Sequence, residues 1–131
     1  MTPFRIFDGF QPGVVLGTHS EAITPEQIAA WSRIYGSGPS AESEALASLI
    51  LVLMLRAYMV ITEPRPKGNI HARQKLLINA LPSVGEAVNT RLSCLTKEMR
   101  RDRRYIEFEA IGTGNGGRPL YRAIMTAIWA A

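Results

Sequence analysis

The second half of the chain is organised by a two-residue alternation of apolar and polar positions. Such alternation is typical of a strand with one face on a core and the other in solvent. In the segment EAVNTRLSCLTKEM it places Val88, Thr90, Leu92, Cys94 and Thr96 on one side of the pleat. We therefore expect a meander of about four long antiparallel strands, at 69–82, 86–99, 103–114 and 118–130.

Turn-forming segments separate the last three of these strands. The charged segment RRDRR follows the second strand, and the glycine-rich segment GTGNGG follows the third. Both are short enough to close hairpins. GTGNGG lacks the Lys-Ser/Thr ending of a phosphate-binding loop and joins two strands, so we interpret it as a hairpin turn.

A helix with clear end signals is predicted in the segment ITPEQIAAWSRIYG. Thr24 is a suitable N-cap, Pro25 fits the first helical position, and Gln27 completes a capping box. Gly36 ends the helix. Upstream of it, residues 4–7 and 14–22 have the character of strands, separated by the turn-rich DGFQPG.

The segment EALASLILVLMLRAYMVI, at 44–61, is apolar on every side except at Arg56. As a helix it is about 27 Å long, slightly short for a membrane span, and it contains a charge. We therefore predict a core helix rather than a span, with the head of Arg56 at the rim of the core. A curved sheet wrapped around this helix would give both elements a core.

Composition places the chain among ordinary globular domains. Of its 131 residues, 47% are hydrophobic and 20% charged, which predicts a single domain over 1–131. Cys94 has no disulfide partner, which fits a reducing compartment, and the N-terminus does not resemble a signal peptide. We expect a cytoplasmic protein that does not associate with a membrane.

The net charge of +4 permits an acidic or phosphate-bearing partner but does not require one. The excess is concentrated between Lys97 and Arg104, at a hairpin tip where a solvated turn is a better explanation than a phosphate or partner contact. Base-stacking aromatics and a groove-reading helix are not apparent, so we do not expect binding to nucleic acid.

Several segments resemble MaoC-like hydratases and dehydratases, which have the α+β hot-dog fold. The stretch from Val84 to Trp129 is similar to the family's C-terminal strands, and the segment PSVGE is similar to the turn that precedes them. PGVVLG and ITPEQIAAWSRIYG resemble the opening strand and the T-x-E-x-I helix of the family. The resemblance implies a curved antiparallel sheet around the core helix at about 44–61, with one extra short helix.

The same resemblance implies an acyl thioester ligand, on coenzyme A or on an acyl carrier protein, and hydration or dehydration of its acyl chain. The family uses an Asp and a His, five residues apart, on the loop before the core helix. Here that loop is YGSGPSAESEA, and the two positions fall on Gly36 and Ala41, or one residue later on Ser37 and Glu42. Neither alignment preserves the pair, so we name no confident catalytic residue.

Weaker candidates for the site remain. Glu42 or His71 could replace the missing acid or base, although Glu42 is also explained by the helix dipole and His71 by an ordinary strand position. The residues expected to contact the ligand are Ser37, Gly38, Ser40, His71 and Arg73. His19 has no partner visible in the sequence. The two histidines are too far apart to suggest a metal pair, and we expect neither a metal nor a cofactor.

Three hypotheses follow for the function. The first is an acyl-thioester-binding protein that lacks the standard pair and completes the pocket of a catalytic MaoC-like subunit, as a heteromer, or forms a homodimer. The second is an active enoyl-CoA hydratase or an acyl-CoA thioesterase with a re-sited Glu42 or His71. The third is an assembly module with a closed pocket.

Overall fold

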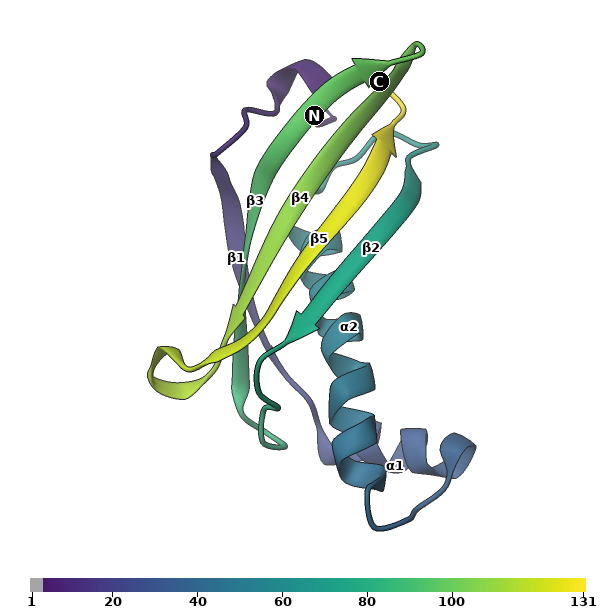
Figure 1. Ribbon diagram of the computed structural model, residues 1–131, viewed down its shortest axis with the longest axis vertical. Helices are drawn as coiled ribbons and strands as arrows, with labels where there is room; N and C mark the ends of the chain where they lie inside the picture. Colours follow the sequence, from purple (N-terminus) through teal and green to yellow (C-terminus); the bar gives the residue numbers. More distant parts are fainter. Residues whose placement is uncertain (1–3) are drawn as a thin grey trace.

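The computed structural model describes residues 4–131 as two helices and a curved, five-stranded antiparallel sheet (Figure 1). The elements are a 3₁₀ turn η1 (Phe7–Gly9), β1 (Val15–Ala22), α1 (Pro25–Tyr35), α2 (Ala41–Ile61), β2 (Ile70–Ile78), β3 (Ala87–Arg100), β4 (Arg103–Thr113), a 3₁₀ turn η2 (Asn115–Gly117) and β5 (Pro119–Trp129). The predicted α+β class, the long apolar helix and the extra short helix are confirmed. The long helix begins at Ala41, slightly earlier than expected.

The strand order is β1-β3-β4-β5-β2, which differs from the expected meander. β3, β4 and β5 are consecutive antiparallel neighbours, joined by the two predicted hairpins. β2, however, pairs with β5 and lies at the opposite edge of the sheet from β1. The prediction of a four-stranded meander is therefore wrong, because local alternation identifies a strand but does not specify its neighbour.

The strand expected at 4–7 is not present either. Phe7 begins η1, and the backbone N–H of Arg5 donates to the carbonyl of Pro64 (2.8 Å). The indole N–H of Trp129 donates to the carbonyl of Arg5 (2.7 Å). This segment therefore packs as irregular chain beside the ends of α2 and β5.

Helix α1 has the end signals that its sequence predicts. The N–H of Gln27 donates to Thr24 Oγ1 (3.1 Å), and the N–H of Thr24 donates to Gln27 Oε1 (2.8 Å), which forms the capping box. Gly36 follows the last turn at φ +98°, a conformation that is unstrained only for glycine. Residues close in sequence thus determine both ends of α1.

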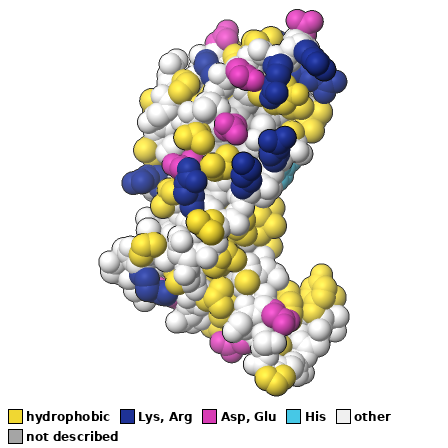
Figure 2. Space-filling model, viewed as in Figure 1, with side chains coloured by type: hydrophobic (Ala, Val, Ile, Leu, Met, Phe, Trp, Pro, Cys, Tyr) yellow, Lys and Arg dark blue, Asp and Glu magenta, His cyan; other side chains and the backbone are white. Residues whose placement is uncertain are grey.

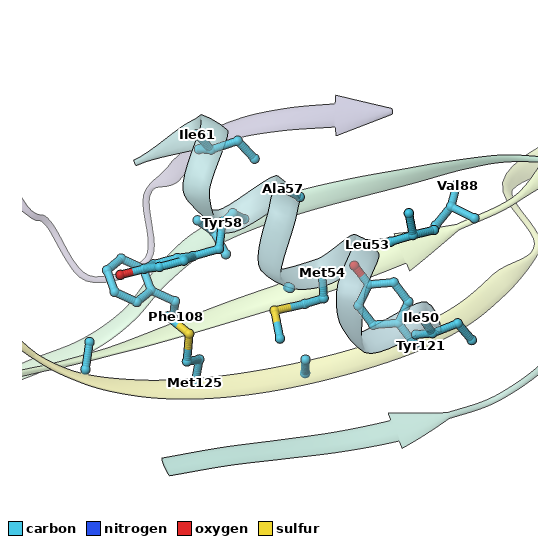
Figure 3. Close-up of a cluster of buried hydrophobic side chains, with 14 of the residues drawn as sticks. Ile50, Leu53, Met54, Ala57, Tyr58, Ile61, Val88, Phe108, Tyr121 and Met125 are labelled. Atoms are coloured by element: carbon cyan, nitrogen blue, oxygen red, sulfur yellow. The ribbon is translucent and has the colours of Figure 1, made fainter. Parts of the chain in front are cut away.

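The concave face of the sheet packs against one side of α2 (Figure 3). Ile50, Leu53, Met54 and Ala57 recur at helical spacing on that side and are buried. They meet inward residues of the strands, including Ile106, Phe108 and Ala110 of β4. Burying one large apolar side chain contributes about 1.5–3 kcal/mol, so this layer is the main source of stability.

The predicted alternation along β3 is correct up to Cys94 and fails beyond it. Val88, Thr90, Leu92 and Cys94 are all buried, and burial raises the pKa of the Cys94 thiol. A β-bulge between Cys94 and Thr96 then shifts the register by one residue. Thr96 is consequently exposed, and its predicted place on the inner side of the strand is wrong.

Glu86 joins two turns at the end of the sheet opposite the β3–β4 hairpin. Its side chain is 3% exposed. The carboxylate accepts hydrogen bonds from the N–H groups of Asn115 (2.8 Å) and Ser83 (2.9 Å) and pairs with the guanidinium of Arg118. These interactions, that from Asn115 first, lower the pKa of Glu86 from its ordinary 4.5 to about 2.

Tyr121 passes directly over Gly112 of the neighbouring strand. A Cβ added at Gly112 would lie 2.0 Å from a ring carbon of Tyr121, which is 1% exposed and shares a buried hydrogen bond with Thr90. We expect Gly112→Ala to lower the free energy of unfolding by about 1–3 kcal/mol, because the buried ring must move. Urea denaturation measures this loss. Gly38→Ala, in open space, is the control and should change stability by less than about 0.5 kcal/mol.

The other side of α2 is not covered by any part of residues 4–131. Val52, Met59 and Val60 are 39%, 49% and 56% exposed. α2 has 21 residues, and an 18-residue window within it has a mean hydropathy of 2.0, so it also meets the length and composition of a membrane span, but its inward side forms the core. The expectation of a helix surrounded by the sheet is therefore only half met, and one apolar side of α2 lacks a partner in residues 4–131.

Candidate functional site

The loop before α2 lies where α1 and the first turns of α2 project beyond the sheet (Figure 1). Ser37, Gly38 and Ser40, three of the expected ligand contacts, are exposed there. Ser40 Oγ donates to Glu44 Oε1 (2.9 Å), and the N–H of Ala41 donates to the carbonyl of Gly38 (3.1 Å). The loop is thus held by its own backbone and one serine, with Ser37 and Gly38 facing solvent.

Glu42 stands on the first turn of α2. It is exposed and makes no hydrogen bond or ion pair with any other described residue. Neither imidazole bonds to it, because His19 lies in β1 and His71 at the start of β2. Among residues 4–131, no group of three or more His, Cys, Asp or Glu side chains could hold a metal.

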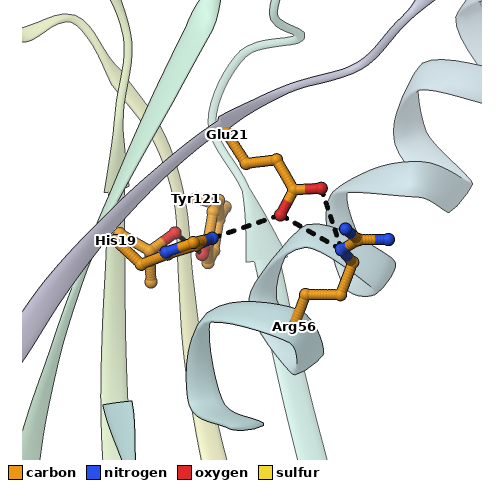
Figure 4. A network of polar contacts seen from close by, with 5 residues as sticks. His19, Glu21, Arg56 and Tyr121 are labelled. Atoms are coloured by element: carbon orange, nitrogen blue, oxygen red, sulfur yellow. Dashed lines mark hydrogen bonds and ion pairs between the residues drawn. The ribbon is translucent and has the colours of Figure 1, made fainter. Parts of the chain in front are cut away.

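An imidazole–carboxylate contact occurs instead within β1, on the side that faces α2 (Figure 4). His19 Nε2 lies 3.2 Å from Glu21 Oε1, and Arg56 Nε lies 2.8 Å from Glu21 Oε2. The expectation that His19 has no partner is wrong. Its i, i+2 spacing from Glu21 was the available signal, because alternate residues of a strand share a face. The Arg56 head reaches the rim of the core, as expected, and ties α2 to β1.

A pocket of about 410 Å³ lies between the C-terminal half of α2 and the start of β2. The helix contributes apolar and aromatic side chains, and the following loop and strand contribute most of the polar ones. The lining residues are Leu55, Tyr58, Met59, Arg65, Pro66, Gly68, Asn69, Ile70 and His71. An apolar wall with a few convergent polar groups is typical of a small-molecule site.

Arg65 closes the helix end of this pocket. Its guanidinium donates to the carbonyl of Met59 and to Thr62 Oγ1 (3.1 Å), groups that the last turn of α2 leaves available. The same guanidinium lies 5.8 Å from the ring centre of Tyr58, whose pKa is raised by burial and partly lowered again by this cation. Arg65 therefore caps α2.

Asn69 and His71 are the remaining polar side chains of the pocket, because Arg65 is bound to the end of α2. Asn69 Oδ1 accepts the N–H of Ala130 (2.8 Å), while its Nδ2 is buried and has no partner among the described residues. His71 is exposed at the rim and has no hydrogen-bond partner there. A buried amide donor without a partner indicates a position where a ligand acceptor would be stabilised.

His71 and Arg73 lie on opposite faces of β2. His71 is opposite Ala127, a buried residue of the inner face, whereas Arg73 is opposite Thr126, which points the other way. A β-bulge between them causes the switch. Arg73 consequently lines a polar hollow of about 400 Å³ on the outer face. The two residues were expected to bind one ligand, and within one chain they cannot share a site.

The expected site residues therefore form separate groups. Ser37, Gly38, Ser40 and Glu42 lie at the N-terminal end of α2, and His71 lies beside its C-terminal half. Leu55 of the pocket lies fourteen positions after Ala41 along the helix, which corresponds to about 21 Å. The pocket residues of α2 were not named from the sequence, because their apolar side chains are not distinguishable from core residues by pattern.

Basic side chains are scattered over the outer face of the sheet and the β3–β4 hairpin (Figure 2). Two of them fix the chain ends, because Lys97 Nζ donates to the carbonyl of Phe7 (3.1 Å) and Arg104 donates to that of Ala130 (3.3 Å). Arg100 pairs with Glu98 (3.1 Å). The hairpin cluster is thus partly structural, while Arg100, Arg101 and Arg103 line one open hollow together with Tyr105.

Solved structures identify the fold. No protein-family model and no curated protein matches the chain. A MaoC-like dehydratase from Rhodospirillum rubrum matches with a TM-score of 0.76 at 13% identity, covering 95% of this chain and 97% of that one. An R-hydratase from Pseudomonas aeruginosa matches with a TM-score of 0.70 at 12% identity, covering 95% and 84%.

A third match is an assembly of more than one kind of subunit. It is the 3R-hydroxyacyl-ACP dehydratase complex HadBC from Mycobacterium tuberculosis, with a TM-score of 0.66 and 15% identity, covering 84% of this chain and 90% of that one. These likenesses confirm the fold expected from the resemblance of the sequence. The chain has the hot-dog fold in the form that it takes in MaoC-like dehydratases and R-hydratases.

Proposed function

We propose that the chain is a hot-dog subunit that binds an acyl thioester, carried on coenzyme A or on an acyl carrier protein, and completes a pocket with a partner chain. The main support is the pocket beside α2, which is apolar on its helix side and opens at the edge of the sheet. Its neighbours in fold include an R-hydratase and a hydroxyacyl-ACP dehydratase.

The chemistry of the pocket fits such a ligand. Leu55, Met59 and Ile70 offer apolar surface to an acyl chain. The unpartnered Nδ2 of Asn69 could donate to the thioester carbonyl, and His71 lies at the rim where the carrier arm would enter. Apolar burial would supply affinity, and the amide would orient the carbonyl.

A partner chain would complete this pocket by symmetry. The loop at 36–42 and the pocket lie at opposite ends of α2. A two-fold or pseudo-two-fold axis across the β2 edge reverses the partner, so the partner's copy of this loop would lie beside the pocket of the present chain. The partner would also cover Val52 and Met59, the exposed apolar residues of α2.

The chain itself would contribute binding rather than proton transfer. Gly36 and Ala41, or Ser37 and Glu42, stand where a MaoC-like loop would carry its acid–base pair. Loss of a general base costs about 10²–10⁴-fold in rate. A partner that retains an Asp and a His on its own loop would supply this chemistry.

Binding can be mapped residue by residue because the chain is only 14.4 kDa. In an amide NMR titration with butyryl- and hexanoyl-coenzyme A, we expect shifts to cluster at Leu55, Met59, Asn69 and His71. Leu55→Trp, which fills the pocket, should weaken binding about tenfold or more, since it removes space for the acyl chain. Val60→Trp adds the same bulk one turn away, outside the pocket, and should leave binding unchanged. Shifts elsewhere, or none, would contradict the proposal and favour a closed assembly module.

Turnover separates the binding subunit from the catalytic alternatives. We expect the chain alone neither to remove the enoyl absorbance of crotonyl-coenzyme A nor to hydrolyse acyl thioesters. Activity that disappears in Glu42→Gln or His71→Ala would instead support a hydratase or thioesterase with a re-sited acid or base. The control is the same reaction without protein, which measures spontaneous loss of the thioester in the presence of the thiol reagent.

A further inference from the structure

Two hollows adjoin on the outer face of the sheet, where basic and acidic side chains lie side by side (Figure 2). One, of about 400 Å³, crosses β3, β4, β5 and β2, and the other, of about 600 Å³, lies at the β3–β4 hairpin. We treat them as one outer groove, because Arg100 and Tyr105 line both. The outer groove runs from Glu107 and Thr126 past Tyr105 to Arg100, Arg101 and Arg103. The pocket beside α2 lies on the other side of the sheet.

Two β-bulges build one end of the outer groove. A bulge in β3 turns Thr96 to the outer face, and a bulge at the start of β2 does the same for Arg73. Thr96 pairs with Glu107, Glu107 with Thr126, and Thr126 with Arg73, so the four residues form one row across β3, β4, β5 and β2. Bulges re-aim side chains and are over-represented next to active sites. Here two separate bulges contribute to the same row of polar groups.

The hairpin end of the outer groove is cationic. Along β4 the next outward residues toward the hairpin are Tyr105 and then Arg103, about 7 Å apart. Arg103 pairs with Arg100 across the strands, and like charges directly opposite destabilise strand pairing. Arg100 has Glu98 as a partner, whereas Arg101 and Arg103 have no ion pair or side-chain hydrogen bond with any described residue. A bound anion would relieve this repulsion.

The charges of the outer groove do not balance. The carboxylate of Glu107 accepts a hydrogen bond from Thr96 Oγ1 (2.8 Å) and forms no ion pair with the described residues. Arg73 lines the same hollow and is also without an ion pair among them. Altogether, four guanidinium groups and two carboxylates line the groove, which leaves two positive charges. A phosphate monoester carries about −1.5 to −2 at pH 7 and would compensate them.

We propose that the outer groove binds a phosphate monoester of a polyhydroxylated compound, a sugar phosphate or a nucleoside phosphate. The guanidinium groups of Arg101 and Arg103 hold the phosphate, since arginine binds phosphate oxygens through charge-assisted hydrogen bonds. Glu107 accepts hydrogen bonds from the hydroxyl groups of the ligand, and the hydroxyl of Thr126 beside it can donate or accept. The ring of Tyr105, between the two ends, offers a flat apolar surface to the body of the ligand. This site does not depend on the proposed function.

Titration calorimetry with inorganic phosphate, ribose 5-phosphate and ribose tests the two ends of the groove separately. At about 50 mM salt, where charge interactions are weakly screened, ribose 5-phosphate should bind with a Kd about tenfold lower than that of phosphate. The added affinity comes from the hydrogen bonds of the sugar hydroxyls. Ribose alone should not bind measurably. Adenosine monophosphate distinguishes the two ligand classes, because binding tighter than that of ribose 5-phosphate identifies a nucleoside phosphate and equal binding a sugar phosphate.

Two variants should separate the phosphate from the hydroxyl groups. Arg103→Gln should weaken the binding of phosphate and of ribose 5-phosphate about tenfold each, because it removes a cation that both ligands use. Glu107→Gln keeps an oxygen for Thr96 and should weaken ribose 5-phosphate about fivefold without weakening phosphate. Arg91→Gln is the control, since Arg91 is exposed on β3, lines neither hollow and loses the same charge. It should change neither Kd by more than about twofold.

Three outcomes would overturn the inference. Equal affinity for phosphate and ribose 5-phosphate would mean that the Glu107 end takes no part. A loss in Arg91→Gln as large as that in Arg103→Gln would mean that the anion is attracted only by the general charge of the surface. Amide NMR shifts caused by ribose 5-phosphate at Leu55 and Asn69, instead of at Tyr105 and Thr126, would place the ligand in the pocket beside α2. Ribose 5-phosphate contains no thioester, so these results are independent of the proposed function.

Discussion

Replacing Phe108 with alanine is expected to lower the free energy of unfolding by about 3–5 kcal/mol. Phe108 is 0% exposed, and its ring centroid lies 5.6 Å from that of Phe10, 5.4 Å from Tyr58 and 5.7 Å from Trp129. Removing the ring leaves a cavity between α2 and the sheet. Because β4 is hydrogen-bonded to β3 on one side and β5 on the other, it cannot move inward to fill that cavity. Urea denaturation followed by circular dichroism measures the loss.

Tyr105→Ala is the matched control for this prediction. Tyr105 lies on the same strand but on the outer face, where the Arg100 guanidinium stacks 4.5 Å from its ring centre. Its removal should cost less than about 1 kcal/mol, because a partly exposed ring loses little burial. Equal losses in the two variants would mean that the concave face of β4 is not the core.

Glu86→Gln is expected to lower the melting temperature by about 10 °C at neutral pH. The carboxylate accepts hydrogen bonds from two backbone N–H groups and pairs with Arg118, and it is almost fully buried. An amide of the same shape has one acceptor oxygen and no charge, so one donor and the guanidinium of Arg118 lose their partner. Differential scanning calorimetry measures the shift.

The stabilisation from Glu86 should also depend on pH. Its pKa is about 2 in the folded chain, below the ordinary 4.5 that applies when unfolded. A carboxyl with a depressed folded pKa stabilises the fold above the unfolded value and loses this effect as pH falls toward the folded value. The melting temperatures of wild type and Glu86→Gln should therefore converge between about pH 4.5 and 2.

Glu109→Gln controls for the loss of one negative charge. Glu109 pairs with Arg122 (2.7 Å) on the outer face of the sheet and accepts no backbone N–H group. Its replacement should change the melting temperature little, since exposed ion pairs contribute about 0–1 kcal/mol. A gap between wild type and Glu86→Gln that persists at pH 2 would contradict the role given to this carboxylate.

Short-range signals predicted most of the secondary structure. The capping box of Thr24 and Gln27, the glycine that ends α1, and the RRDRR turn were all placed correctly. At that turn, Arg101 and Asp102 adopt φ values of +52° and +64°, as a two-residue hairpin requires. In each case the interacting residues are within a few positions of one another, so the sequence pattern contains the whole interaction.

Bulges account for the errors in which face a side chain takes. One extra residue near Thr96 moved it from the inner to the outer face, and another between His71 and Arg73 separated two expected ligand contacts. A bulge reverses the two-residue alternation after it. No pattern in a single strand reveals where its partner skips a residue.

The sequence by itself determined both helices and all five strands of the sheet, though it also predicted a strand at 4–7 that is absent, and it determined the apolar character of α2 and the lack of Asp and His in the loop before it. The tertiary structure decided that β2 joins β5, whose facing residues Ile78 and Tyr121 are 43 positions apart, and that a pocket opens beside this edge. The physical reason is that a helix end or tight turn depends on neighbouring residues. Strand order, bulges and pockets depend on packing between distant segments, each of which has a sequence compatible with several arrangements.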